Sequence, residues 1–86
     1  MMSDLWARGR KQYVEVLATH HIDGEVRPRR IVMADGHVYD IDDVKHVCRA
    51  ATRRTGEVAL RYTVKIRGRE TYLFEDGGRW FVEMKE

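Results

Sequence analysis

The fold is decided by residues 56–84, GEVALRYTVKIRGRETYLFEDGGRWFVEM, in which apolar and polar side chains alternate over long runs. Successive side chains of a β-strand point to opposite faces of a sheet, so residues 58–66 are expected to form a strand with one apolar and one basic face. A helical period of about 3.6 residues would scatter the same apolar groups around the axis. Glycine-containing breaks at 67–69 and 76–78 divide the stretch into three consecutive antiparallel strands.

The register of these strands depends on the lengths of the two turns. Three-residue turns would place Tyr62 opposite Phe74 and Phe74 opposite Trp80, whereas two-residue turns would mix apolar with charged side chains. The sequence therefore predicts three-residue turns and one apolar face, with Leu73 and Phe81 on the other face. The predicted core consists of Val58, Leu60, Tyr62, Val64, Ile66, Tyr72, Phe74, Trp80 and Val82.

The N-terminal half carries the same strand pattern with weaker signals. Residues 13–20 and 26–34 are predicted strands. Pro28 lacks an amide donor, which indicates an edge or a bulge in the second of them. The Asp35-Gly36 dipeptide is a strong hairpin signal and predicts a third strand at residues 37–41.

A short helix is expected between the two groups of strands. Val44, Val47 and Cys48 recur at helical spacing, with an aspartate before them as a cap, and residues 49–55 would form a polar connection. The sequence thus predicts a mostly β fold of about six short strands and one short helix, in the order β-β-β-α-β-β-β. Such elements form a small, strongly twisted antiparallel sheet or a partly open barrel.

The length of 86 residues is that of one domain, which we place at residues 11–86 after a flexible N-terminal tail at residues 1–10. A single cysteine excludes an internal disulfide, as is usual in a reducing cytosol. The tail lacks the apolar centre of a signal peptide, and no stretch approaches the roughly 20 apolar residues of a membrane-spanning helix. We therefore expect a cytoplasmic protein that has no membrane partner.

The sequence contains no recognisable catalytic or metal-binding motif. Adjacent His20 and His21 would point to opposite faces of a strand, and no C-x-x-C or H-x-x-x-H spacing occurs. The only serine, Ser3, lies in the tail, and Cys48 lies on the apolar stripe of the expected helix, where a thiol is inert. We predict no metal site, no cofactor and no enzymatic activity.

The distribution of charge along the chain is more informative about binding partners than the net charge of +2. Residues 45–69 hold eight basic side chains against the single acidic Glu57, and a basic band of this kind is the minimum for binding a polyanion. Consecutive phosphates of a nucleic acid would contact such a row, while an outward Phe81 or Tyr13 would stack on a base. The predicted nucleic-acid contacts are Arg53, Arg54, Arg61, Lys65 and Arg67.

A second function fits the sequence equally well. The predicted sheet has apolar side chains on both faces, among them Leu17, Leu73 and Phe81. A second subunit or a protein partner could bury those that the domain itself leaves exposed. Lysine and arginine are also common on the solvated face of a sheet. Two non-catalytic functions stay open: binding of nucleic acid or another polyanion, and self-association or protein–protein interaction.

Several segments of the chain resemble a set of short, uncharacterised bacterial proteins. RYTVKI at 61–66, ETYLF at 70–74 and RWFVE at 79–83 are similar to a shared C-terminal pattern, and PRRIVMADGHVYDIDDV at 28–44 is similar to an upstream hairpin. The similarity covers residues from about Tyr13 to Met84, and its aromatic positions are the most specific part. The resemblance implies a bacterial cytosolic protein; it implies no activity, cofactor or catalytic residue.

Overall fold

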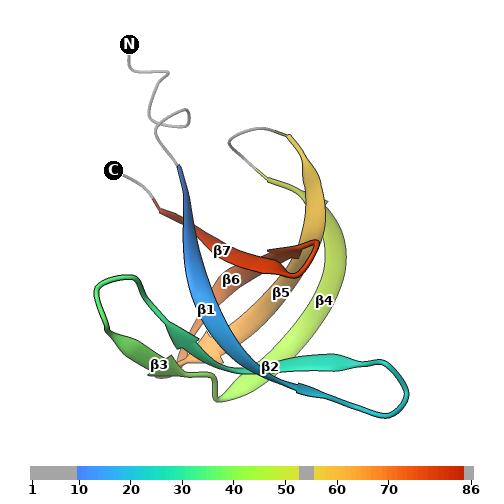
Figure 1. Cartoon of the computed structure of the whole chain (residues 1–86), viewed down its shortest axis with the longest axis horizontal. Helices are drawn as coiled ribbons and strands as arrows, with labels where there is room; N and C mark the ends of the chain where they lie inside the picture. Colours follow the sequence, from blue (N-terminus) through green and yellow to red (C-terminus); the bar gives the residue numbers. More distant parts are fainter. Residues whose placement is uncertain (1–9, 53–55, 85–86) are drawn as a thin grey trace.

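The computed structural model describes residues 10–52 and 56–84, which form seven β-strands and, within these ranges, no helix (Figure 1). No helix able to cross a membrane is therefore found in this part of the chain. The predicted mostly β, antiparallel fold is confirmed. The strands are β1 Arg10–His20, β2 Val26–Val32, β3 Val38–Asp40, β4 Asp43–Ala51, β5 Val58–Ile66, β6 Arg69–Asp76 and β7 Arg79–Met84.

The seven strands form one antiparallel sheet in the order β3-β2-β1-β7-β6-β5-β4. Within the described residues, consecutive strands pair with one another except β3 and β4, which are the two edges of the sheet, and β1 also pairs with β7. The sheet curls into a half-barrel that is open along this seam (Figure 1). At one end the seam is tied, because Ile41 N–H donates to the carbonyl of Arg29 (2.9 Å) and Asp42 N–H to that of Lys65 (2.8 Å).

The short helix predicted at residues 42–48 is wrong, because this segment is the first part of strand β4. Val44 lies opposite Val64 while His46 lies opposite Thr63, so Lys45 is the extra residue of a β-bulge. A bulge lengthens the spacing between two side chains on one face from two residues to three. The helical spacing of Val44 and Val47 is therefore produced by a bulged strand, which also makes the strand count seven instead of six.

The three-residue turns predicted after β5 and β6 are also wrong. Ile66 pairs with Arg69 and Asp76 pairs with Arg79, so each turn holds two residues. Both central residues have positive φ, at 52° and 79° in Arg67-Gly68 and at 62° and 90° in Gly77-Gly78. Positive φ at both positions marks the type I′ turn, whose twist matches that of the flanking strands.

The two-residue turns divide the predicted core between two faces. Tyr62 pairs with Leu73 on the inner face of the half-barrel, whereas Phe74 pairs with Phe81 on the outer face. Leu73 is thus fully buried where we expected it outside the core, while the predicted core residues Tyr72 and Val58 are 49% and 56% exposed. The inner cluster has Ile31, Tyr62, Val64 and Leu73 at its centre, with Val14, Val16, Met33, Tyr39, Ile41, Val44, Leu60, Ile66, Trp80 and Val82 around them. The outer cluster consists of Ala59, Phe74 and Phe81.

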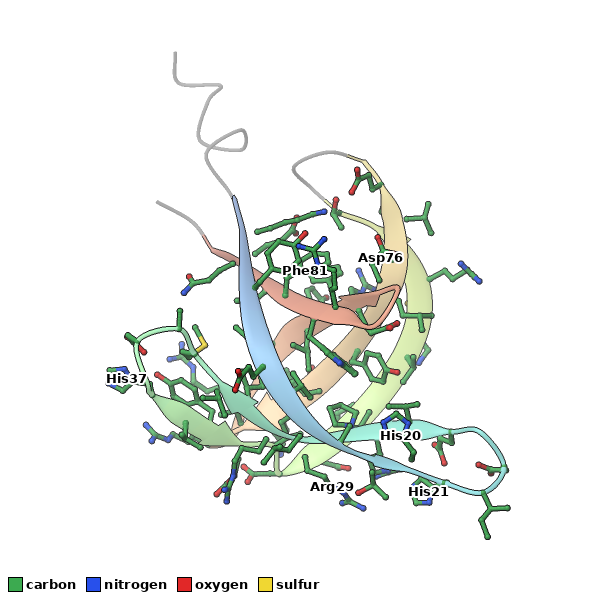
Figure 2. The ribbon with its side chains drawn as sticks, in the orientation of Figure 1. His20, His21, Arg29, His37, Asp76 and Phe81 are labelled. Carbon is green, nitrogen blue, oxygen red and sulfur yellow. The ribbon has the colours of Figure 1, made fainter. Side chains whose placement is uncertain are left out.

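An ion pair spans the outer cluster. Lys11 Nζ, from β1, lies 4.7 Å from the centroid of the Phe81 ring and donates to Oε1 of Glu57 (2.9 Å), just before β5. Strands β7 and β6 lie between β1 and β5, so the contact joins strands that are not neighbours in the sheet. This hydrogen bond raises the pKa of Lys11. Figure 2 shows Phe81 in the space between β1 and β5.

Pro28 lies next to a bulge, as predicted. Ala18 pairs with Pro28 while the preceding Leu17 pairs with Arg30, so Arg29 is the extra residue of β2. The Arg29 carbonyl accepts the amide of the β3–β4 link, and its Nε donates to Oγ1 of Thr19 (3.0 Å; Arg29 is labelled in Figure 2). The bulge therefore interrupts the pairing of β2 with β1, while the Arg29 carbonyl extends the pairing of β2 toward the β3–β4 link.

Two substitutions of Gly77 test the conformation of the β6–β7 turn. A Cβ at this position meets nothing within 4 Å, so any effect comes from the backbone φ of 62°. Asparagine tolerates this conformation, and Gly77→Asn should leave the free energy of unfolding unchanged or raise it by up to about 1 kcal/mol. Valine does not tolerate this conformation, and Gly77→Val should lower the free energy of unfolding by about 1–2 kcal/mol. Urea unfolding of both variants measures the difference; equal stabilities would contradict the turn assignment.

Adjacent residues of β6 test the register directly. Leu73→Ala should lower the free energy of unfolding by about 2–5 kcal/mol, because it leaves a cavity in the inner cluster. Tyr72→Ala should lower it by less than about 1 kcal/mol, since the ring is half exposed and its main contact is with an arginine. Thermal or urea unfolding gives both values. A larger loss for Tyr72→Ala would favour the three-residue turns.

Candidate functional site

A row of five side chains crosses the outer face of the sheet. Each member lies directly opposite the next across β1, β7, β6, β5 and β4. At the β1 end the Tyr13 ring contacts the Phe81 ring edge-on (5.7 Å), and Phe81 is stacked on Phe74 (5.2 Å, 8° between the planes). In order, the row is Tyr13, Phe81, Phe74, Arg61 and Cys48. Three aromatic rings are therefore followed by a guanidinium group and a thiol.

Arg61 is the most unusual member of this row. Its guanidinium carbon lies 4.4 Å from the centroid of the Tyr72 ring, and Nη2 donates to Sγ of Cys48 (3.7 Å). Its Nε is buried without a hydrogen-bond partner, and Arg61 forms no ion pair with any described residue. The side chain therefore contacts an aromatic ring and a thiol, and no described carboxylate neutralises its charge.

The predicted nucleic-acid contacts do not form one line. Arg61 and Lys65 lie on the outer face of β5, four residues or about 13 Å apart along the strand. Arg67 lies in the β5–β6 turn with its guanidinium carbon 5.3 Å from the ring centroid of Tyr39, which packs against the inner cluster. Arg67 is therefore directed away from the other two. Arg53 and Arg54 lie outside the described residues.

A second arginine–tyrosine pair on the outer face was missed in the sequence. The guanidinium carbon of Arg79 lies 4.1 Å from the centroid of the Tyr13 ring, which is 44% exposed. Phe81, considered above as a stacking surface, is only 1% exposed and cannot meet a base, whereas Tyr13 can. A prediction of two-residue turns would have identified these residues from the sequence, because this turn length places Tyr72 and Arg79 on the same face as Arg61.

Acidic side chains moderate the charge of this face. Glu70 and Asp43 lie directly opposite Lys65 on its two neighbouring strands, and Asp76 lies opposite Arg79. Asp43 is paired with Lys45 (3.8 Å), and Lys65 forms no ion pair in the described part of the chain. The outer face thus presents separate cationic groups beside exposed tyrosine rings, and no continuous basic stripe. We call Tyr13, Arg61, Lys65, Tyr72 and Arg79 the cationic–aromatic surface.

The inner face holds a cleft of about 450 Å³ beside the β1–β2 hairpin. Its floor includes Tyr62 and Trp80, whose ring centroids are 5.2 Å apart with 45° between the planes. Glu75 lies on the same face, directly opposite Leu60 and Trp80, and its Oε2 accepts the amide N–H of Gly78 (2.7 Å). Burial raises the pKa of the Tyr62 hydroxyl, and the carboxylates of Glu75 and Glu25 raise that pKa further.

Both edges of the sheet carry features that discourage pairing with another strand. The β3 edge is three residues long, and the β4 edge is interrupted by the bulge at Lys45, a charged side chain. Short strands, bulges and lysines are the usual protection of a sheet edge. The described edges therefore offer little support for association through strand pairing.

Potential metal ligands are dispersed. Figure 2 shows His20 and His21 on the β1–β2 hairpin and His37 at the opposite side of the molecule, in the turn before β3. His37 Nδ1 lies 2.9 Å from Oδ2 of the neighbouring Asp35. Among the described residues, no three histidine, cysteine or carboxylate side chains converge.

Comparison of the chain with protein-family models, with curated proteins and with solved structures finds no match. The resemblance to short bacterial proteins stays a prediction, and function is argued from the geometry of the two faces.

The buried hydroxyl of Tyr62 predicts how stability depends on pH. Because its pKa is raised above 10.0 in the folded state, the folded protein holds this proton more tightly than the unfolded chain does. The contribution is complete below pH 10 and is lost as the pH rises through the folded-state pKa. As the pH rises above 10, the wild type should therefore lose more stability than Tyr62→Phe, which cannot ionise. Urea unfolding of both proteins across this range measures the difference; parallel profiles would contradict the assignment.

Proposed function

We propose that this protein is a non-catalytic binding module that contacts single-stranded nucleic acid through the cationic–aromatic surface. The observation that carries the proposal is Arg61, which is fixed against the Tyr72 ring and has no carboxylate partner among the described residues. A positive charge held in this way favours an anionic ligand, since its geometry is already set before binding.

The composition of the surface favours a single strand over a duplex. Proteins that bind single strands combine cations that contact phosphates with exposed aromatic rings on which bases stack. Here Tyr72 and Tyr13 are exposed, each with an arginine over its ring, and Lys65 adds a second phosphate contact along β5. Duplex recognition would use an element that enters a groove, and this curved face presents none.

Self-association or binding of a protein partner is the alternative function. Its main motivation was an uncovered second apolar face, yet Leu73 and Phe81 are 0% and 1% exposed within the chain itself. Leu17 on β1 is 56% exposed and still supports a protein partner. The molar mass from size exclusion with light scattering distinguishes a dimer from a monomer.

The test of the nucleic-acid proposal is fluorescence anisotropy with a labelled oligothymidylate over a range of salt concentrations. The wild type should bind with an affinity that falls as salt rises. Arg61→Gln with Lys65→Gln should weaken binding by about tenfold or more and reduce the slope of log K against log salt by about 1.4, from two lost phosphate contacts.

The matched control is Arg49→Gln with Arg69→Gln. These exposed residues also lie on the strands beside β5 and change the net charge equally, but they pair with Leu60 and Ile66 and so belong to the inner face. The control should retain wild-type affinity and salt slope. Equal weakening by both double variants, or the absence of binding by the wild type, would overturn the proposal.

A further inference from the structure

The inner-face cleft contains a carboxylate in an apolar setting. Glu75 is half-buried, with Leu60 directly opposite on β5 and Trp80 directly opposite on β7. Most of the other cleft residues are apolar, among them Val16, Ala18 and the Tyr62 ring, and the imidazole of His20 also lines the cleft. A carboxylate among mostly apolar side chains favours a ligand that carries a positive charge.

Within the described residues, Glu75 forms no ion pair. One carboxylate oxygen, Oε2, accepts the amide of Gly78 and so supports the β6–β7 turn. The second oxygen has no hydrogen-bond donor among the described groups. The turn therefore accounts for Oε2, and the other carboxylate oxygen of Glu75 stays available to a ligand.

Two aromatic rings lie beside this carboxylate. Trp80 and Tyr62 contact one another and both line the cleft with Glu75. The face of an aromatic ring attracts organic cations, and quaternary ammonium groups are bound in proteins by rings of this kind together with carboxylates. The cleft volume of about 450 Å³ lies within the range of small-molecule sites.

We propose that the inner-face cleft binds a small organic ammonium compound, with the cation between Glu75 and the ring of Trp80. The Tyr62 ring is buried and contacts the Trp80 ring, so it holds that ring in place. The apolar part of the ligand contacts Val16, Ala18 and Leu60. This site lies on the face opposite the cationic–aromatic surface, and it is independent of the nucleic-acid proposal.

The test compares choline with its neutral isostere, 3,3-dimethylbutan-1-ol, by following the fluorescence of Trp80 in a protein that carries Trp6→Phe. Choline should bind at least about tenfold more tightly than the alcohol, because only choline carries a positive charge that the Glu75 carboxylate and the face of the Trp80 ring attract. Glu75→Gln should remove this preference while its side-chain oxygen still accepts the Gly78 amide.

Asp76→Asn is the matched control, since it removes the neighbouring carboxylate from the outer face and changes the net charge equally. It should leave the preference for choline unchanged, and circular dichroism checks that both variants fold. If Glu75→Gln does not fold, the comparison of choline with the alcohol in the Trp6→Phe protein decides the proposal.

Three results would overturn it: absence of choline binding, equal affinity for the alcohol, and equal weakening by both variants. Binding of a lysine-containing peptide without binding of choline would also overturn it, because the cation would then belong to a protein partner.

Discussion

The structure depends on the positive φ of both central residues in two tight turns. Arg67-Gly68 and Gly77-Gly78 each close a hairpin with two residues, and this length fixes the register of β5, β6 and β7. Side chains alternate with a period of two, so one more residue in either turn would move a whole strand's set of side chains to the other face. The register decides that Leu73 is buried and that Tyr72 is exposed.

This register gives the sheet two clusters and two distinct faces. The half-barrel encloses the larger cluster around Tyr62, and Lys11 and Glu57 form an ion pair beside Phe81 on the other face. The outer face buries the Phe74 and Phe81 rings beside the guanidinium groups of Arg61 and Arg79, while the inner face keeps a mostly apolar cleft with one carboxylate.

Much of the fold was predictable because strand alternation is a local signal. The pattern of residues 58–66, the Asp35-Gly36 turn and the bulge beside Pro28 each follow from neighbouring residues alone. The turn lengths were wrong because we required one apolar face, which a curled sheet with two clusters does not need. The helix was wrong because the bulge at Lys45 imitates helical spacing. Of the predicted contacts, Arg61 and Lys65 share a face, whereas the partnership of Arg61 with Tyr72 depends on the register and could not be read before it.

The central claim is the register, and cross-strand nuclear Overhauser effects between backbone protons measure it most directly. The two-residue turns predict contacts between Thr63 and Tyr72 and between Tyr62 and Leu73 on the β5–β6 ladder, with Phe74 opposite Phe81 on the next. Contacts that instead pair Val64 with Tyr72 and Tyr62 with Phe74 would contradict the account and return Phe74 to the face of Tyr62.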